Sequence, residues 1–424
     1  MPKPRQFALR LALISAAALA IRLFYALVMM ADVPASGDGR QFQLLASILA
    51  DEGKYLHPVS SLREGAEIPT AEKPPLYPAY VALVHLLGWS SYEAQRAASC
   101  LLGAALTAIV GLVGREVGGD RTGLIAAGLA AVYPMLVVLD GSGRSESLYV
   151  LLVALILLLA YRLRSAPGWK TAAALGAVIG LAALTRSESV AYLVLVAAPA
   201  AWMARPGRGD RLRLAGAALV AFALVIAPWQ LRNLTTFDRP VALSTNEGGL
   251  LAGANCGLAY YGVDLGTWPC YPGDLPTREL DESELSWRLR EEALDYAGDH
   301  LERLPAVVGV RVLRTWELWD TRDQAAIEIK ISERHLRVHQ AGVLALFALI
   351  PLAVWGAIIL RRRGEPLSLL LAPIVLVTVL SALTYGTSRF RAAADVSLVL
   401  LAAVAIGRAL ELRARRREPA PADR

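Results

Sequence analysis

The segment PLYPAYVALVHLLG, residues 75–88, decides how this chain is arranged across a membrane. It is apolar, but it is shorter than the roughly 20 residues that a helix needs to cross a bilayer. If it does not cross, the basic loops at 115–121, 162–170, 205–213 and 361–363 and the basic C-terminal tail all fall on the cytoplasmic side. We therefore expect a re-entrant or interfacial helix against the outer surface.

The composition is that of a polytopic membrane protein. Of the 424 residues, 55% are hydrophobic and 19% are charged, and the mean hydropathy is +0.45. About ten transmembrane helices are predicted from the apolar segments of spanning length, which are 7–30, 94–114, 122–140, 147–163, 171–187, 189–204, 213–230, 340–360, 367–384 and 393–411. The predicted fold class is all-α, with interfacial helices on the outer face. The 43 basic residues exceed the 37 acidic ones and gather in short runs, which indicate membrane anchors and not a nucleic-acid surface.

This topology leaves the charged motifs on the outer side of the membrane. Ionisable groups at the membrane boundary are costly and are commonly functional. A site that faces outward at the interface is therefore expected. The candidate site residues among the polar residues of the outer segments are Asp38, Lys73, Arg144, Glu146, Arg186, Glu188, Asn246, Glu247, Arg389 and Arg391.

Two motifs of opposite charge lie in the first outer loop. Asp38, in Ser-Gly-Asp-Gly, is placed to take a proton from an acceptor hydroxyl; the alternative is a turn residue or the N-cap of a helix over 40–49. Lys73 precedes two prolines that fix the backbone, so its ammonium suits a phosphate, unless it simply snorkels at a helix start. Arg40 and Tyr77 are further candidate contacts to the same ligand.

The outer turns GSGRSESLY and LTRSESV repeat one pattern of arginine, serine and glutamate. Capping of the following helix accounts for the serine and the glutamate. It does not account for Arg144 and Arg186, which are costly there unless they are paired or near water. Arg22, late in the first span, raises the same question, and its alternatives are pairing with Asp38 or Glu146 and plain snorkelling.

The turn YGTSRFR, residues 385–391, precedes the last span. Arginines on the outer side run against the positive-inside bias, so Arg389 and Arg391 favour an anionic ligand such as a phosphate or diphosphate. The sequence has no zinc-type His/Cys cluster, phosphate-binding loop or Gly-x-Ser-x-Gly elbow. The sequence therefore offers no metal-binding motif, and we predict no nucleotide at the site.

The long outer loop contains two of the three cysteines and a helical pattern. Cys256 and Cys270 are a candidate disulfide if the compartment is oxidising, and separate thiols are the alternative. The helical pattern runs over 281–320. Its later part is expected along the headgroup boundary because of Arg311, Arg314, Trp316 and Trp319.

Taken in order, five features resemble the superfamily C membrane glycosyltransferases: a carboxylate after the first span, KPPLYP, an outer Arg-x-Glu turn, RN followed by STNEGG, and YGTSRFR before the final span. The branch that looks most similar holds the bacterial protein O-mannosyltransferases and the lipid A aminoarabinose transferases, which are like glycosyltransferase family 39. The resemblance implies the C-type fold, a polyprenyl-phosphate-linked sugar as donor, and work on the outer face of the membrane.

The resemblance also implies roles for individual residues. Asp38 matches the carboxylate that acts as, or lies near, the catalytic base, and Lys73 matches the lysine that contacts the lipid phosphate. Glu146 matches the acidic position of the second loop, and Arg389 and Arg391 match the late arginines. The family often has two adjacent acids in its first loop, whereas here a glycine follows Asp38. This difference argues against a role that needs a second adjacent carboxylate, including metal binding.

The predicted function is an inverting glycosyltransferase of the inner (plasma) membrane, multi-pass, with its active site on the extracytoplasmic side. Asp38 and Glu146 are the predicted catalytic residues. Donor or lipid-phosphate contacts are predicted for Arg40, Lys73, Tyr77, Arg144, Arg186, Arg389 and Arg391, and acceptor or loop roles for Glu188, Asn246 and Glu247. The expected partners are the lipid-linked donor, membrane lipids and a lipid, glycan or protein acceptor, without nucleic acid. No cofactor is expected, and a divalent metal is left open.

The predicted domain organisation follows the spans. Residues 1–230 form an N-terminal transmembrane catalytic module that includes the outer loop 31–93, and 231–340 form an extracytoplasmic loop with amphipathic helices. Residues 341–412 hold the C-terminal transmembrane helices, and 413–424 form a disordered cytoplasmic tail. The alternative function is a transporter or flippase of lipid-linked sugars, which would call for charges near mid-membrane and internal symmetry. A non-catalytic scaffold is a third interpretation.

Overall fold

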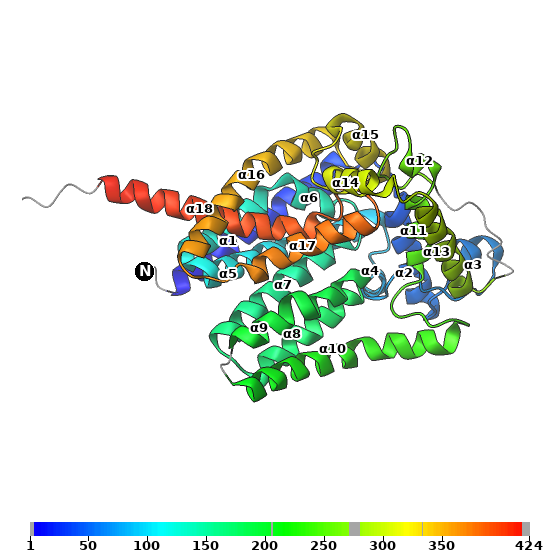
Figure 1. Ribbon diagram of the computed structural model, residues 1–424, viewed down its shortest axis with the longest axis horizontal. Coiled ribbons are helices and arrows are strands. Elements are labelled where there is room, and N and C mark those ends of the chain that lie inside the picture. The colour runs from blue at the N-terminus through cyan, green and yellow to red at the C-terminus, as the bar shows by residue number, and fades with distance from the viewer. Residues whose placement is uncertain (1–3, 205–206, 271–279, 333, 418–424) are drawn as a thin grey trace, which may run out of the picture.

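The structure is a computed structural model that describes residues 4–204, 207–270, 280–332 and 334–417. In this part of the chain, seven helical segments are long and apolar enough to cross a membrane, and three shorter apolar helices accompany them. The spanning elements run side by side along the long axis of the molecule (Figure 1). They are α1 (Pro4–Phe24) with its continuation η1 (Tyr25–Met29), α5 (Tyr92–Val132), α7 (Glu146–Ser165), α8 (Trp169–Ala183), the segment η2 (Ser187–Ala191), η3 (Leu193–Ala197) and α9 (Ala198–Ala204), α10 (Arg208–Thr236), α16 (Leu336–Arg362), α17 (Ser368–Leu383) and α18 (Ala392–Arg417).

The helix α5 contains two spans and not one. Its backbone leaves helical geometry at Gly118 and Gly119, and Gly119 has a φ of +83°, which favours glycine. A side chain added at Gly114 would lie 2.9 Å from the Cβ of Ala126, so the two halves of α5 lie against each other as a tight antiparallel pair. The second half continues into α6 (Pro134–Asp140). The ten predicted spans are helical over most of their lengths, and the all-α polytopic fold is confirmed.

Arg22 is fully buried, and it pairs with neither Asp38 nor Glu146. Its Nε lies 2.7 Å from the carboxylate of Asp140. Its other nitrogens donate to carbonyls near the end of α5, including Ala130 at 2.9 Å, and to one carbonyl of its own helix. Pro134 has no N–H with which to satisfy the Ala130 carbonyl. The arginine therefore caps a broken helix end inside the bundle, which is why it is tolerated there.

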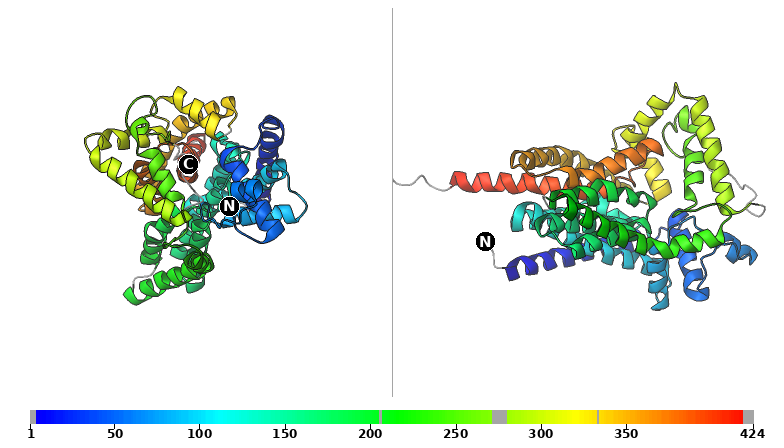
Figure 2. Two further views of the ribbon diagram at one scale, coloured as in Figure 1. Left: turned by 90° about the vertical axis from the view of Figure 1, so that its right-hand side faces the viewer. Right: turned by 60° about the horizontal axis from the view of Figure 1, so that its bottom comes forward.

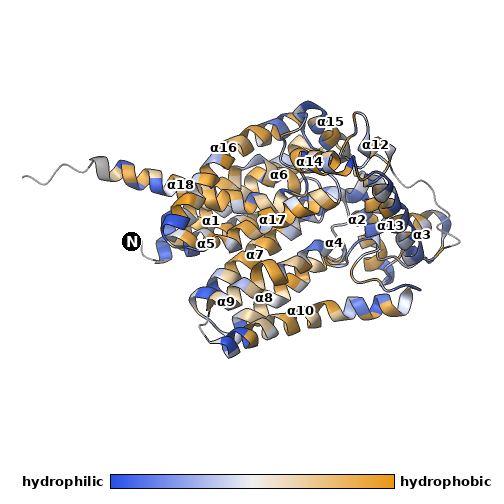
Figure 3. Ribbon diagram, viewed as in Figure 1, coloured by the Kyte–Doolittle hydropathy of each residue, from blue (hydrophilic) through white to orange (hydrophobic). Residues whose placement is uncertain are grey.

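The polar segments gather at one end of the bundle, which we call the loop end. They comprise α2 (Gly37–Glu52), α3 (Pro58–Glu64), α4 (Leu76–Leu86), α11 (Asn246–Ala254), α12 (Gly257–Tyr260), α13 (Glu282–Asp299), α14 (Leu304–Thr315) and α15 (Thr321–Ser332). Seen from this end, the segments of 31–93 and those of 280–332 lie on different sides of the bundle (Figure 2, left). The opposite end, which we call the basic end, carries Arg361, Arg362 and the C-terminal end of α18. Hydrophobic residues dominate between the two ends (Figure 3).

Two predictions about the loop end have different outcomes. Residues 76–86 form the short helix α4, which at 1.5 Å per residue is roughly 16 Å long and cannot span the hydrocarbon core. The predicted helical pattern over 281–320 is present as α13 and α14. Arg311 and Arg314 point into the protein, however: both are buried, and they donate to carbonyls of Ala254 and Leu265 at 2.6 and 2.7 Å. These hydrogen bonds hold α14 against the end of α11 and the loop that follows it.

Candidate active site

Asp38 is the centre of an ion-pair cluster at the loop end. It lies in the first turn of α2, directly after Gly37, whose φ is +45°. One carboxylate oxygen is 3.0 Å from the Lys73 ammonium. The other oxygen is 2.9 Å from the Arg389 guanidinium and 3.7 Å from that of Arg144. Cations from three separate segments of the chain therefore converge on one carboxylate.

Glu146 also pairs with Arg389, one of the two arginines that contact Asp38. It is the first residue of α7 and is buried, and its Oε1 accepts from Arg389 at 2.7 and 3.0 Å and from Arg186 at 3.1 Å. Arg186 also contacts Glu188 at 2.6 Å. The two Arg-Ser-Glu turns of the sequence thus meet each other through Glu146 and Arg186. Arg389 bridges them to Asp38.

Glu72 completes the cluster next to Lys73. Its carboxylate lies 3.2 Å from the Lys73 ammonium and accepts from Gln41 at 2.6 Å. With Asp38, Glu146 and Glu188 it supplies four carboxylates, which balance Lys73 and the three arginines in formal charge. The sequence places Glu72 in the same charged loop as Asp38 and Lys73, but no spacing signal gave it a role of its own.

The charges of the cluster hold one another in their ionised forms. Burial by itself would raise the pKa of Asp38, but Lys73, Arg389 and Arg144 outweigh burial and hold that pKa well below its ordinary value. Burial would lower the pKa of Lys73, and the neighbouring Asp38 and Glu72 raise it instead. The same balance, with Glu146 and Asp38 as partners, raises the pKa of Arg389.

The cluster is open on the side of Asp38 and closed behind Glu146. The Asp38 side chain is 26% exposed and those of Lys73 and Arg389 are each 13% exposed, whereas Glu146 is 2% exposed. Behind it, beside Arg144, Glu146 and Arg389, lies a cavity of only about 10 Å³, which has room for about one water molecule. The exposed edge of the cluster is therefore the one that holds Asp38.

Aromatic rings border the cluster at the last turn. Tyr385 lies with its ring centroid 5.0 Å from that of Phe390 and 6.5 Å from that of Trp268. Arg186 lies over the rings of Phe390 and Tyr149 at 5.4 and 5.6 Å. These rings limit where the arginine can move, and they give the site an apolar wall.

Five predicted site residues lie outside the cluster. Arg40 is exposed and bonds to Gln43 at 2.8 Å, and Tyr77 is fully buried with its hydroxyl 3.1 Å from that of Ser99. Arg391 is buried and pairs with Asp395 at 3.1 Å. The remaining two, Asn246 and Glu247, begin α11; Glu247 is exposed and lies 3.8 Å from Arg290.

The long loop is tied together by a disulfide. Cys256 and Cys270 are bonded, with their Cα atoms 6.5 Å apart. Next to this bond, the amide of Gly386 donates to the Gly266 carbonyl at 2.8 Å, so the disulfide-closed loop touches the turn that carries Arg389. Within the described residues, no group of three or more His, Cys, Asp or Glu side chains is arranged to hold a metal ion.

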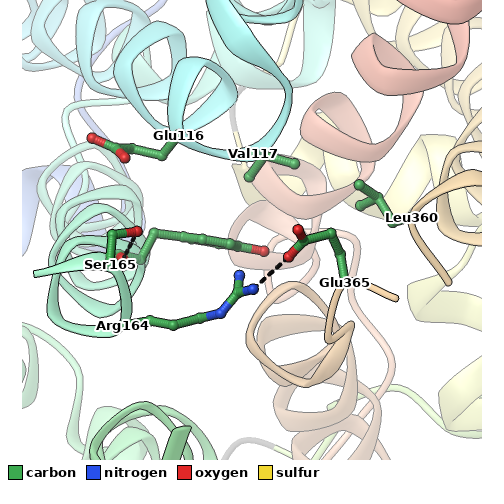
Figure 4. Close-up of a pocket in the computed structure, with 7 residues that line it drawn as sticks. Glu116, Val117, Arg164, Ser165, Leu360 and Glu365 are labelled. Carbon is green, nitrogen blue, oxygen red and sulfur yellow. Dashed lines mark hydrogen bonds and ion pairs between the residues drawn. The ribbon is translucent and has the colours of Figure 1, made fainter. Parts of the chain in front are cut away.

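A second polar cavity lies at the basic end, far from the cluster. It measures about 230 Å³ and contains an ion pair of 2.6 Å between Arg164 and Glu365 (Figure 4). None of the predicted site residues lines it. Its lining residues are Glu116, Val117, Tyr161, Arg164, Ser165, Leu360 and Glu365.

The bundle of spans with polar segments at its loop end is shared with solved membrane proteins. The chain has the fold of the oligosaccharyltransferase of Archaeoglobus fulgidus. Within it, residues 72–230 match the family described as dolichyl-phosphate-mannose-protein mannosyltransferase. No curated protein matches the chain.

Similar solved structures include the following three. The oligosaccharyltransferase of Archaeoglobus fulgidus, tethered with an acceptor peptide, has a TM-score of 0.60 at 14% identity, over 98% of this chain and 51% of that one. The same organism's AglB, in complex with an inhibitory peptide and a dolichol-phosphate, has a TM-score of 0.53 at 14% identity, over 99% and 52%. ArnT from Cupriavidus metallidurans, bound to undecaprenyl phosphate, has 0.46 at 16% identity, over 93% and 77%. The chain therefore spans about half the length of the oligosaccharyltransferase chains that it matches.

Proposed function

We propose that this protein is a glycosyltransferase that moves a sugar from a polyprenyl-phosphate donor to an acceptor on the extracytoplasmic face of the inner membrane. The observation that carries the proposal is Asp38, a partly exposed carboxylate held between Lys73, Arg144 and Arg389 at the loop end. Transfer of a sugar with departure of a phosphate requires a base and a set of cations, placed within one side-chain length of each other.

In the proposed reaction, Asp38 takes the proton of the acceptor hydroxyl while that oxygen forms a bond to the anomeric carbon of the sugar. The bond from this carbon to the phosphate oxygen breaks, and the electron pair stays on the polyprenyl phosphate. Lys73 and Arg389 stabilise the negative charge that develops there. Attack from the side opposite the phosphate inverts the anomeric configuration.

The same cations explain how a carboxylate with a depressed pKa acts as a base. Without a donor, Lys73 and Arg389 are engaged by Asp38. A phosphate that takes their hydrogen bonds withdraws this stabilisation from the ionised form of Asp38, so its pKa rises on donor binding. Asp38 thus becomes a stronger base only when a substrate is present.

The orientation and the partners belong to the same proposal. The basic runs at 361–363 and 413–417 lie at the end opposite the cluster, which supports a cytoplasmic basic end and an extracytoplasmic site. The matched family description and the dolichol-phosphate of the AglB structure support a lipid-linked donor. In the proposed domain organisation, 1–230 form the catalytic module, 231–340 the outer loop and 341–412 the last spans. The donor sugar, hexose or pentose, is what the experiment below identifies.

The experiment is sugar transfer by the purified protein in detergent, from a panel of labelled polyprenyl-phosphate sugars to acceptors in a membrane extract. We expect incorporation from one donor, reduced roughly 10²–10⁴-fold in Asp38→Asn because the general base is lost. Asp51→Asn is the matched control: it removes a carboxylate from the same helix, 64% exposed and away from the cluster. Transfer that survives in Asp38→Asn would remove Asp38 from the mechanism. Labelled lipid that crosses reconstituted vesicles without any transfer would favour a flippase.

A further inference from the structure

The turn that presents Arg389 is held from behind by two buried charged residues of the outer loop. Glu328 of α15 accepts hydrogen bonds from the Thr387 hydroxyl at 2.9 Å and from the Ser388 amide at 2.8 Å. Arg334 donates to the Ser388 hydroxyl at 2.7 Å and lies 3.5 Å from the Glu328 carboxylate. Glu328 is 1% exposed and Arg334 is 5% exposed, so these contacts are shielded from water.

The residues that Glu328 and Arg334 contact are next to Arg389 in the chain, and Arg389 belongs to the cluster. Thr387 and Ser388 immediately precede Arg389, whose side chain then extends to Asp38 at 2.9 Å and Glu146 at 2.7 Å. Glu328 therefore fixes the backbone from which the guanidinium is aimed. The turn itself lies between the end of α17 and the start of α18, and the amides of Thr387 and Ser388 are bonded to side chains of the outer loop.

A buried carboxylate is tolerated only where hydrogen bonds and a cation compensate its lost hydration. Glu328 has this compensation, because Gln324 of the same helix adds a third hydrogen bond at 3.1 Å, besides the nearby Arg334. The strongest hydrogen bonds are those with a charged partner. An ionised acceptor at this place thus holds the turn more rigidly than a neutral one.

We infer that Glu328, supported by Arg334, is a positioning residue for Arg389. The inference deepens the proposed function and rests on it, because the aim of Arg389 matters there for binding the donor phosphate. It also gives the outer loop a part in the chemistry: α15 belongs to the loop, whereas Arg389 precedes the last span. A cation must be held to within about 0.5 Å to act on a developing charge.

The first test needs no substrate. Phenylglyoxal modifies accessible, unpaired arginines. The rate at which it modifies the peptide that contains Arg389 is measured by mass spectrometry. We expect this rate of modification to rise severalfold in Glu328→Gln and further in Glu328→Ala. The matched control is Glu365→Gln, which removes a glutamate paired with Arg164 at 2.6 Å at the basic end and leaves the rate unchanged. An unchanged rate in both Glu328 variants would overturn the inference, whatever the protein catalyses.

The second test uses transfer kinetics. We expect the donor KM to rise about tenfold in Glu328→Gln, the effect of weakening a charge-assisted hydrogen bond. A variant that merely folds less well would lose kcat at constant KM. If Glu328 acts through Arg389, combining Glu328→Gln with Arg389→Lys raises KM no further than Arg389→Lys alone. Additive effects of the two replacements on KM would refute the positioning role. Failure of the wild type to transfer any sugar would refute the proposed function. In that case the phenylglyoxal test still decides the inference about Glu328.

Discussion

Lys73 and Asp38 control each other's charge. Lys73 is the strongest attractive neighbour of Asp38, followed by Arg389 and Arg144, and together they hold the Asp38 pKa far below the usual value of about 3.9. The direction in which this pKa makes stability depend on pH follows from it. A depressed pKa contributes stability above the unfolded value, and this stability is lost as the pH falls through the folded value. Asp38 is therefore ionised throughout the neutral range and well into the acid range.

The replacement Lys73→Gln should move the acid limb of the transfer activity to higher pH. Without the ammonium, less positive charge opposes the protonation of Asp38, so its pKa rises and the base is lost at a higher pH than in the wild type. The measurement is kcat/KM against pH. Lys54→Gln serves as the control, because this lysine is exposed and pairs with Glu67 away from the cluster. Coincident acid limbs in Lys73→Gln and the wild type would contradict the assigned interaction.

At the scale of helices, close approach is decided by glycine. A Cβ added at Gly176 of α8 would lie 1.8 Å from the Ala218 carbonyl of α10, so these two helices touch backbone to backbone. Small residues let membrane helices approach in this way, which replaces the hydrophobic driving force that is absent between helices in lipid. The pair α8 and α10 lies at the edge of the bundle (Figure 1).

Gly176→Ala should lower the melting temperature of the purified protein, because the helices must move apart at a cost of about 1–3 kcal/mol. Gly216→Ala is the matched control on α10, where nothing lies within 4 Å of the added Cβ. There the helix propensity of alanine should stabilise by about 0.5–1 kcal/mol. Equal shifts of the same sign in both variants would argue against the packing of α8 on α10.

For the whole molecule, the decisive property is which end faces the cytoplasm. Lys54 at the loop end is 46% exposed and Arg213 at the start of α10 is 85% exposed. The native cysteines give little background, since Cys100 is buried and the other two form a disulfide.

In intact cells, an impermeant thiol reagent should label Lys54→Cys and leave Arg213→Cys unlabelled until the membrane is permeabilised. This outcome follows from the positive-inside distribution of the basic residues. The reverse pattern would place the cluster in the cytoplasm and would remove the support for an extracytoplasmic donor.

The sequence was a good guide where the signal is local. Asp38, Lys73, Arg144, Glu146, Arg186 and Arg389 were singled out from short motifs, and the structure brings all of them together. It was a poor guide where the direction of a side chain depends on packing. Tyr77 and Arg391 belong to motifs that resemble those of a known family, yet both point into the interior, and Arg40 points to solvent. One residue along a turn or helix changes the direction of a side chain by about 100°, which a motif does not record.

Long-range partners were beyond reach for a related reason. The pairing of Arg22 with Asp140 joins residues 118 positions apart, and Glu328 meets Ser388 across 60 positions. Each depends on how whole helices are placed.

By itself, the sequence determined which segments are apolar helices and which short motifs carry the charges, because a bilayer selects for apolar length and for the placement of arginine and lysine. The tertiary structure alone decided which of those charges meet. Asp38, Lys73 and Arg389 come from the two ends of the chain, and only the packing of the last spans against the first brings their opposite charges within 3.0 Å. Coulomb attraction depends on distance in space, and distance along the chain does not predict it.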